Sequence, residues 1–395
     1  MGCKVTYIPL GELAKFESGG TPSKKEERYW NGTIPWISAK TLVGDAVCKS
    51  DLFITKQGLD AGSKLAPKGS LLLLTRGSGL FKHIPLAIAE KDVAYNQDIK
   101  CIEATAEGIS NRYLFYTLKA LEPAISAMLE TTGIGAGKLA TDRLKALRIP
   151  VLDEAARLRV TYIADCINGK LSLNTKLNGY LLELMNVQYR HSFCCNKSSL
   201  GSIYDIANVV YGAAFKSALF NEEKVGYPLI RIRDLSTFSP QYWTNEAHPK
   251  RVFVHPGDVL AGMDAEFTPC LWQGEMAVLN QRVCLFEPAA DSGVSRSYLL
   301  MALKPLLVFI QNYASGTTVA HMGKGDLEAL NVPIPARGDL ERFNTIAEPL
   351  REQIVQNSIQ NRKLAALRDA LLPKLISGEI DVSRVDLMQL NSHLT

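Results

Sequence analysis

The sequence predicts an α+β protein built from two copies of one unit, each a mixed globular domain followed by a long helix. Three observations favour this fold. Similar motifs recur at a nearly constant offset, short β-branched and aromatic runs alternate with Gly and Pro turns, and each copy ends in helical periodicity. The 395 residues are 47% hydrophobic and 21% charged, which is typical of a chain with two or three folded domains.

The duplication is visible in four pairs of motifs. The pairs are residues 34–42 with 227–235, 67–71 with 256–260, 95–99 with 279–283, and 142–150 with 325–333. The offset of the last pair also carries Ile163 onto Ile346 and Asn174 onto Asn357. Matches that run the length of both halves at almost one offset indicate a duplicated unit.

A long helix is predicted at the end of each copy, because apolar side chains recur every three or four residues there. About 35 residues make a rod of about 50 Å. A helix with a single narrow apolar stripe needs another helix to cover that stripe, and the obvious partner is the helix of the other copy. The expected seam consists of Ile163, Ile167, Asn174, Leu177, Leu181, Ile346, Leu350, Ile354, Asn357 and Leu364. The two asparagines either fix the register inside the seam or rotate to the flank of their helices, and both interpretations stay open.

No catalytic or metal-binding motif stands out in the sequence. The six histidines show no HExxH spacing, and the cysteines show no CxxC pair. Residues 133–138 resemble a phosphate-binding loop only in part, because Thr132 and Leu139 occupy positions that the Walker pattern gives to Gly and to Ser or Thr. We therefore expect a binding protein that is not an enzyme, with no metal and no cofactor of its own.

The location predicted for the protein is the cytoplasm. The longest apolar stretch, residues 299–310, is too short for a membrane span, and residues 1–10 show no signal peptide. The eight cysteines are therefore expected to be reduced thiols. The net charge of +4 is compatible with a nucleic-acid partner but does not require one.

The chain resembles the specificity subunit of type I restriction-modification enzymes. Residues 367–380, Leu-Arg-Asp-Ala-Leu-Leu-Pro-Lys-Leu-Ile-Ser-Gly-Glu-Ile, are the most specific match, and the helix entries at 149–154 and 332–335 also fit. The chain departs from the family pattern at Ala155 and Arg342, where Gln is usual, and its first helix end, residues 184–193, is degenerate.

The resemblance implies two target-recognition domains separated by two long helices that form an antiparallel coiled coil with pseudo-twofold symmetry. The expected boundaries are 1–150 for the first domain, 151–193 for the first spacer helix, 194–335 for the second domain, 336–379 for the second spacer helix and 380–395 for a tail. Each domain would read one half of a bipartite site on double-stranded DNA. The helices would dock two DNA methyltransferase (modification) subunits, and restriction or translocase subunits where present. These partners, rather than this chain, would bind S-adenosylmethionine, ATP and Mg.

Candidate DNA contacts are polar and basic residues near Gly-rich turns. They are Lys24, Lys25, Arg28, Lys40, Arg76, Ser78, Lys82 and His83 in the first domain, and Lys216, Arg231, Arg233, Trp243, Lys250, Arg251, His321 and Lys324 in the second. Arg76 could reach guanine from its turn or be an ordinary surface arginine. Arg231 and Arg233 alternate as strand residues on one face do, and that face either reads bases or is merely exposed. Asn96 and Gln97 suit adenine or a structural turn equally well.

The two domains differ in charge. Residues 15–100 hold thirteen Lys and Arg against nine Asp and Glu, whereas residues 200–287 hold seven against ten. Because phosphate attraction supplies much of the affinity for DNA, the second domain alone should bind DNA poorly. The alternative function is a tandem-domain scaffold for protein interactions without a DNA role. A self-contained nuclease or methyltransferase is disfavoured, since no Asn/Asp-Pro-Pro-Tyr motif is present.

Overall fold

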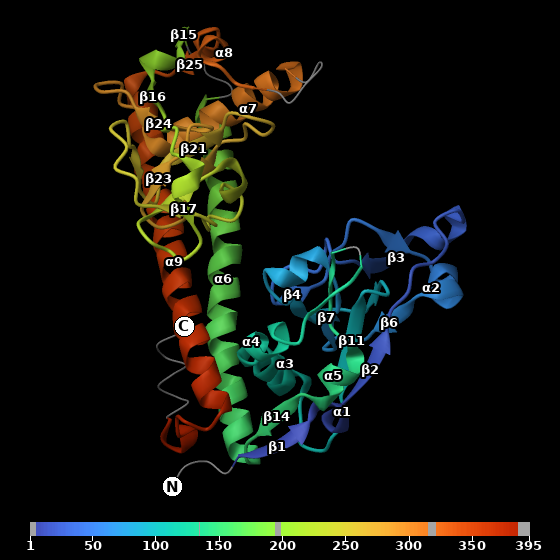
Figure 1. Cartoon of the computed structure of the whole chain (residues 1–395). Helices are drawn as coiled ribbons and strands as arrows, with labels where there is room; N and C mark the ends of the chain where they lie inside the picture. Colours follow the sequence, from blue (N-terminus) through green and yellow to red (C-terminus); the bar gives the residue numbers. More distant parts are fainter. Residues whose placement is uncertain (1–4, 134, 194–198, 315–320, 386–395) are drawn as a thin grey trace. The chain divides into compact units, whose positions relative to one another are not determined.

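The computed structural model describes residues 5–133, 135–193, 199–314 and 321–385, and it divides into two compact units (Figure 1). One unit comprises residues 1–170 and 365–395, and the other comprises residues 171–364. Each unit contains one mixed domain, which we call domain 1 (residues 6–151) and domain 2 (residues 199–334). Each also contains parts of two long helices, α6 (Glu154–Phe193) and α9 (Arg337–Ile376).

Domain 1 is built on two sheets with the strand orders β2-β11-β7-β9-β4 and β5-β3-β10-β6. Smaller sheets pair β1 with β14 and place β13 between β12 and β8. Strand β7 consists of four leucines, and all four are buried because the strand lies inside its sheet. The strands are β1 Thr6–Pro9, β2 Ala14–Ser18, β3 Trp30–Ile37, β4 Ala46–Val47, β5 Phe53–Ile54, β6 Lys64–Ala66, β7 Leu71–Leu74, β8 Arg76–Gly77, β9 Leu86–Ala89, β10 Val93–Tyr95, β11 Ile99–Ala104, β12 Glu130–Thr131, β13 Gly137–Lys138 and β14 Arg148–Val151.

Domain 2 repeats this plan, with the strand orders β16-β24-β21-β22 and β17-β19-β18-β23-β20 and the pair β15-β25. The strands are β15 Ser199–Ser202, β16 Ala207–Tyr211, β17 Phe220–Asn221, β18 Tyr227–Ile230, β19 Trp243–Thr244, β20 Phe253–Val254, β21 Val259–Gly262, β22 Cys270–Leu271, β23 Ala277–Leu279, β24 Val283–Pro288 and β25 Asn331–Ile334. The remaining α-helices described are α1 Leu10–Leu13, α2 Lys56–Gly62, α3 Asn111–Ala120, α4 Glu122–Ser126, α5 Thr141–Ala146, α7 Arg296–Ala314 and α8 Lys324–Glu328.

Equivalent parallel strand pairs show that the two domains share one fold. Strand β3 runs parallel to β10 with Ile37 opposite Tyr95, and β18 runs parallel to β23 with Ile230 opposite Leu279. In both domains an asparagine follows, and its backbone N–H donates to the first strand, to Ile37 O in domain 1 and to Ile230 O in domain 2. The duplicated unit predicted from the sequence is confirmed.

Each domain is tied to its long helix by the same tyrosine contact. The hydroxyl of Tyr113 on α3 donates to the Pro150 carbonyl oxygen at 2.8 Å, and the hydroxyl of Tyr298 on α7 donates to the Pro333 carbonyl oxygen at 2.8 Å. Both prolines lie in the short strand that precedes the helix. The contact fixes the point at which the chain leaves the domain.

Helices α6 and α9 lie antiparallel within each unit. In the unit of residues 171–364, the Asn174 amide donates to Gln360 and Asn361, and Asn178 contacts Ile354 and Ser358. In the other unit, Arg368 donates to Asn168. As the residue number rises on α6, it falls on α9, as expected for an antiparallel pair.

Asparagines lie inside the helix pair. Asn174 and Asn357 are both buried, and the Asn357 amide donates to Asn178 Oδ1 at 2.8 Å. The Asn178 amide also donates to Ser358 Oγ, so the polar groups satisfy one another across the interface. Such a network permits one register and penalises others, because a shifted helix would leave amides buried without partners.

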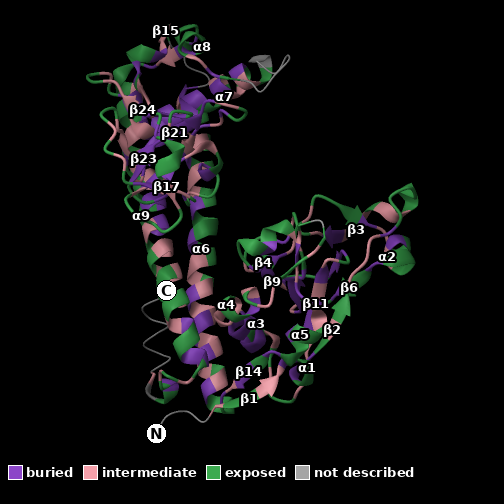
Figure 2. Ribbon diagram, in the orientation of Figure 1, coloured by how far each residue is buried: buried purple, intermediate pink, exposed green. Residues whose placement is uncertain are grey.

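The buried face of α6 differs in part from the expected seam (Figure 2). Buried and half-buried positions run through 156, 160, 163, 167, 171, 174, 178, 182, 185, 189 and 193. This period of about 3.7 residues is close to that of a straight α-helix and longer than the 3.5 of a heptad repeat. Apolar residues with heptad spacing therefore move progressively away from the buried face of α6.

The seam prediction is wrong for Leu177, which is 38% exposed, and for Ile346, which is 46% exposed. Ile163, Ile167 and Ile354 are buried, whereas Leu181, Leu350 and Leu364 are half-buried. The physical reason is the same on both helices, because a residue one position away from the buried face points about 100° around the helix.

Within the described residues, no helix is long and apolar enough to cross a membrane.

Candidate nucleic-acid interface

A basic groove opens in domain 2 where the parallel strands β18 and β23 end. It has a volume of about 440 Å³ and is lined by Phe215, Ser217, Phe220, Arg231, Ile232, Arg233, Asn280, Gln281 and Arg282. Parallel strands bring their carboxyl ends to one edge, so the turns that follow them meet there. The groove thus gathers three arginines and two side-chain amides, which are groups that hydrogen-bond to base edges and phosphates.

The two predicted arginines occupy this groove but do not alternate on a strand. Arg231 follows β18, and Ile232–Asp234 form a 3₁₀ turn held by the Asp234 carboxylate, which accepts from the Arg231 N–H at 2.9 Å. The expectation of a strand face is therefore wrong, because Asp234 caps a turn there. The Arg231 guanidinium lies over the Tyr242 ring at 5.2 Å, and Arg233 is exposed.

Arg282 belongs to the groove and was missed by the sequence reasoning. Its Nε lies 3.3 Å from Asp264 Oδ2, and Nδ1 of the predicted His321 lies 2.6 Å from Asp264 Oδ1. One carboxylate thus gathers two basic side chains that are far apart in the sequence. The available signal was the position of Arg282 directly after the repeated Asn-Gln pair.

In domain 1 the equivalent turn carries Lys40, which corresponds to Arg233 in the repeat. The Lys40 Nζ lies 2.8 Å from Asp51 Oδ2 and both side chains are exposed. The Ser38 N–H donates to Thr41 Oγ1 at 3.0 Å, as Arg231 N–H donates to Asp234 in domain 2. The two turns share a backbone design and differ in the side chains that they present.

At two further positions a charge of one sign in domain 1 is replaced by the opposite charge in domain 2. Arg76, which faces Lys138 across β8 and β13, corresponds to Asp264, which faces His321 at the equivalent bridge. Asp98 follows Asn96 and Gln97 in domain 1, where Arg282 follows Asn280 and Gln281 in domain 2. An edge of the same shape therefore offers opposite charges at matched points.

The other predicted residues of domain 1 lie in two exposed segments. Lys24, Lys25 and Arg28 lie between β2 and β3, where Arg28 pairs with Glu26 at 3.2 Å. Ser78 begins the 3₁₀ turn Ser78–Phe81, and Lys82 and His83 follow it. This second segment continues from Arg76, so these four predicted residues lie in one short stretch of the chain.

The remaining predictions in domain 2 are more scattered. Lys216 lies between the groove residues Phe215 and Ser217, and Trp243 lies on β19 beneath Lys224 at 5.7 Å. Arg251 covers the rings of Tyr227 and Phe253 at 5.1 and 4.7 Å, so packing accounts for much of its surface. Lys250 is exposed beside it, and Lys324 pairs with Glu328 on α8 at 3.3 Å.

Two buried thiols of the described residues are poor nucleophiles. Burial raises the pKa of the Cys284 thiol to about 12 and that of Cys101 to about 11, which keeps both protonated at neutral pH. No group of three or more His, Cys, Asp or Glu in the described part of the chain is placed to hold a metal ion. The groove of domain 2 and the exposed segments of domain 1 present hydrogen-bond donors and basic side chains.

Comparison with known proteins identifies the family. The model of the type I restriction modification DNA specificity domain matches twice, at residues 4–178 and 197–367. The chain is 24% identical to the type I restriction enzyme MjaIX specificity subunit of Methanocaldococcus jannaschii, covering 95% of this chain and 93% of that protein. It is 32% identical to the EcoBI specificity subunit of Escherichia coli over 45% of this chain and 38% of that protein.

A solved structure shares the fold. The S subunit of a type I restriction-modification system from M. genitalium aligns with a TM-score of 0.57 and 15% identity, over 95% of this chain and 96% of that one. The resemblance inferred from the repeats and from residues 367–380 is confirmed. Since the family model matches both halves, the chain belongs to the family of type I restriction modification DNA specificity domains.

Proposed function

We propose that this chain is the non-catalytic subunit that selects the DNA target of a type I restriction-modification complex, with each domain reading one half of a bipartite sequence. The observation that carries the proposal is the pair of equivalent turns after β3 and β18. They share one backbone design and present different side chains. Such a pair suits two readers that recognise different bases by the same docking geometry.

Side-chain chemistry supports reading at these turns. Arginine pairs in a bidentate manner with guanine, and Asn or Gln pairs with adenine. Domain 2 presents Arg231, Arg233, Gln281 and Arg282 at one groove. Domain 1 presents Lys40 and Gln97, and the Thr21 hydroxyl lies 2.6 Å from Gln97 Oε1 and orients that amide. We expect the two half-targets to differ accordingly.

The helices supply the gap between the half-targets. Each of α6 and α9 has 40 residues, which corresponds to about 60 Å of helix. Half-sites one turn of B-DNA apart are separated by about 34 Å. Buried asparagines favour one register of the helices, and we therefore expect the gap in the target to be fixed.

Partner subunits would dock on an exposed apolar stripe of α6. Five side chains at alternating spacings of four and three residues form this stripe: Leu173, Leu177, Tyr180, Leu184 and Val187. An exposed stripe with heptad spacing is a surface that a partner helix can cover. We assign it to a modification subunit, in keeping with the family.

Catalysis then resides in the partners. DNA methyltransferase subunits, expected in two copies, would bind S-adenosylmethionine, and restriction subunits would use ATP and Mg. The negative local charge of residues 200–287 supports this division, because domain 2 needs partners that close around the duplex and contact the phosphates. An assembly that modifies chromosomal DNA works in the cytoplasm.

The test is modified-base sequencing of DNA from cells that express this chain with its neighbouring methyltransferase subunit. The control is the methyltransferase alone. We expect a new motif of two short blocks around a fixed gap that appears only with this chain. A soluble, associated pair that produces no motif would instead favour a protein-interaction scaffold without a DNA role.

A further inference from the structure

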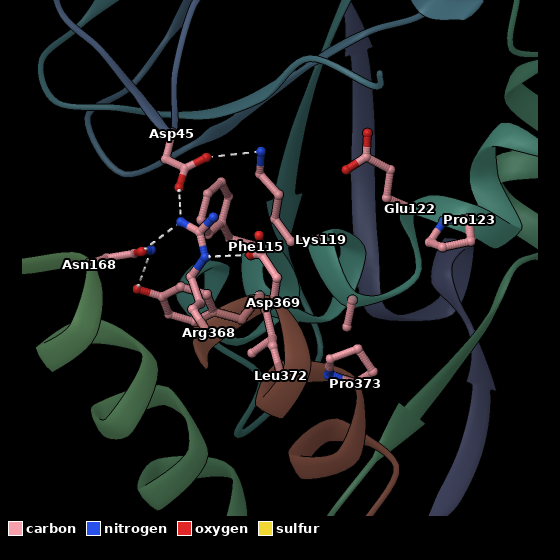
Figure 3. A pocket seen from close by; sticks show the side chains of 12 residues that line it. Asp45, Phe115, Lys119, Glu122, Pro123, Asn168, Arg368, Asp369, Leu372 and Pro373 are labelled. Carbon is pink, nitrogen blue, oxygen red and sulfur yellow. Dashed lines mark hydrogen bonds and ion pairs between the residues drawn. The ribbon is translucent and has the colours of Figure 1, made fainter. Parts of the chain in front are cut away.

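An ionic joint connects domain 1 to the last turns of α9, within the unit of residues 1–170 and 365–395 (Figure 3). It borders a cavity of about 340 Å³. Its residues come from the segment before β4, from α3, from α6 and from α9. The carboxylate of Asp45 pairs with one residue of α3 and one of α9, and α6 joins through Asn168, which contacts the α9 residue.

Asp45 has two cationic partners. Its Oδ1 lies 2.9 Å from Lys119 Nζ, and its Oδ2 accepts from Arg368 Nη1 at 3.0 Å. Arg368 Nη1 also donates to Asn168 Oδ1 on α6 at 3.0 Å, so the same arginine joins both long helices to the domain. The side chains of Arg368, Lys119 and Asp45 are 22%, 24% and 36% exposed. Ion pairs that are shielded to this extent are screened less by salt than fully exposed ones.

The charged groups point at each other and not into an empty binding site. Figure 3 shows Lys119 and Arg368 converging on Asp45, with Asp369 beside the Arg368 guanidinium. Because these cations are already neutralised, the cavity offers an incoming anion little. The ion pairs instead attach domain 1 to α9.

The second repeat carries apolar side chains at the two corresponding positions. The offset of residues 34–42 and 227–235 places Phe238 at the position of Asp45, and the offset of 142–150 and 325–333 places Met185 at that of Arg368. Met185 is fully buried, and Phe238 lines a cavity of about 370 Å³ with Leu182 and Met301. Phe238 and Met185 cannot form an ion pair, so the pair of Asp45 and Arg368 has no ionic counterpart at these two positions.

The joint is connected to the proposed reading turn of domain 1 by a short segment. Residues 38–45 begin with the turn that presents Lys40 and end at Asp45. The segment is held by buried Leu42, whose N–H donates to Ser38 O, and by Asp45 O, which accepts from Ile88 N at 2.9 Å. Fixing the Asp45 side chain on α9 therefore limits the freedom of the Lys40 turn.

We propose that Asp45, Lys119 and Arg368 are positioning residues, forming a latch that orients the reading turn of domain 1 on the helix pair. This inference rests on the proposed function, because it assigns the latch to the fidelity of one half-target. The corresponding described residues of domain 2 are Phe238 and Met185, which carry no charge, so its half-target should be insensitive to changes in Asp45, Lys119 and Arg368.

The test uses the full chain with Arg368→Met, which introduces the residue of the second repeat, and Asp45→Asn, which keeps the size of the side chain. Arg368→Lys retains the charge and should behave as the wild type. The matched control is Arg143→Met, which removes the exposed 3.2 Å pair with Glu130 on the same domain.

Two measurements separate the latch from the proposed function. Hydrogen exchange of the purified chain without DNA should be roughly tenfold faster at residues 42–47 in the first two variants, since charge-assisted hydrogen bonds are lost. Modified-base sequencing with the methyltransferase partner should show tolerance of mismatches in the half-target of domain 1 alone.

Unchanged exchange at residues 42–47 would overturn the latch, whatever the chain does in cells. Faster exchange with an equal loss of methylation or fidelity at both halves would show a merely structural role and overturn the positioning role. Faster exchange with both halves read as sharply as by the wild type would also overturn it. Absence of any motif with the wild-type chain would count against the proposed function, while the exchange result would still decide the latch.

Discussion

Asp264 organises the basic groove of domain 2, because its carboxylate contacts both Arg282 and His321. Arg282 and His321 are separated from Asp264 by 18 and 57 positions, so no local pattern could reveal the cluster. Sequence reasoning found His321 from its basic character and missed Arg282, whose contact arises only when the sheet edge is assembled. The sequence thus identifies candidate residue types, and the fold decides which of them meet.

We expect Arg282→Ala to relax the half-target read by domain 2 and to cost about 1–3 kcal/mol of discrimination, because a base-reading guanidinium would be lost. Competition binding by the assembled complex with single-base target variants would measure this change. Arg337→Ala on α9, which removes only the exposed pair with Glu341, serves as the control. A uniform loss for all sequences would assign Arg282 to phosphate contact.

Glu348 makes the stability of the second unit depend on pH. Burial alone would raise its pKa, but hydrogen bonds from Ser297 and the neighbouring Arg351 outweigh burial and lower the pKa below its ordinary 4.5. A lowered pKa stabilises the folded state above the unfolded value, and that contribution is lost as the pH falls through the folded value.

We therefore predict that acid reduces the free energy of unfolding below about pH 4.5 and that Glu348→Gln removes part of this dependence at a cost of about 1–2 kcal/mol at neutral pH. Urea unfolding at several pH values would measure both effects. Glu341→Gln, at an exposed position of α9, is the control. Identical pH profiles for Glu348→Gln and the wild type would contradict the assignment.

At the scale of elements, the long helices were predictable, but their buried faces were predicted only in part. Leucines at heptad spacing dominate the sequence of α6 and suggest a seam, yet the buried face passes through Asn174 and Asn178. The leucines instead form the exposed stripe. Periodicity alone cannot tell which of two stripes faces the partner helix, because that choice depends on the polar network across the pair.

Leu177→Asp should change the free energy of unfolding by about 1 kcal/mol or less, since the side chain is 38% exposed, and should abolish co-purification with the methyltransferase partner. Ile354→Ala, at a fully buried position, should cost about 2–5 kcal/mol. Urea unfolding and pull-down of the two variants side by side distinguish docking from stability. Strong destabilisation by Leu177→Asp would return this residue to the seam.

At the scale of the whole molecule, the duplication was the most reliable part of the sequence reading. It rested on matches such as Asn96-Gln97 with Asn280-Gln281, and each of these pairs directly follows a strand that lies parallel to its neighbour. Residues that differ between the copies were harder to interpret. The sequence alone does not show that the difference between Asp45 and Phe238 at corresponding positions matters, because only the structure shows the contact of Asp45 with α9.

Modular reading makes a final prediction about exchange of residues 194–335 for the domain of another family member. Only one half of the target should change, because the reading turn of domain 2 lies within the exchanged segment, whereas that of domain 1 and the buried asparagines of the helix pair lie outside it. The contacts between domain 2 and α9 must be kept, however. Gln273 Oε1 accepts from Ser358 at 2.7 Å, and its carbonyl oxygen accepts from Arg362, so the incoming domain needs an acceptor at this position. Modified-base sequencing of the chimera, beside one that carries a hydrophobic residue there, measures both requirements. A chimera that changes both halves, or the gap between them, would contradict independent reading by the two domains.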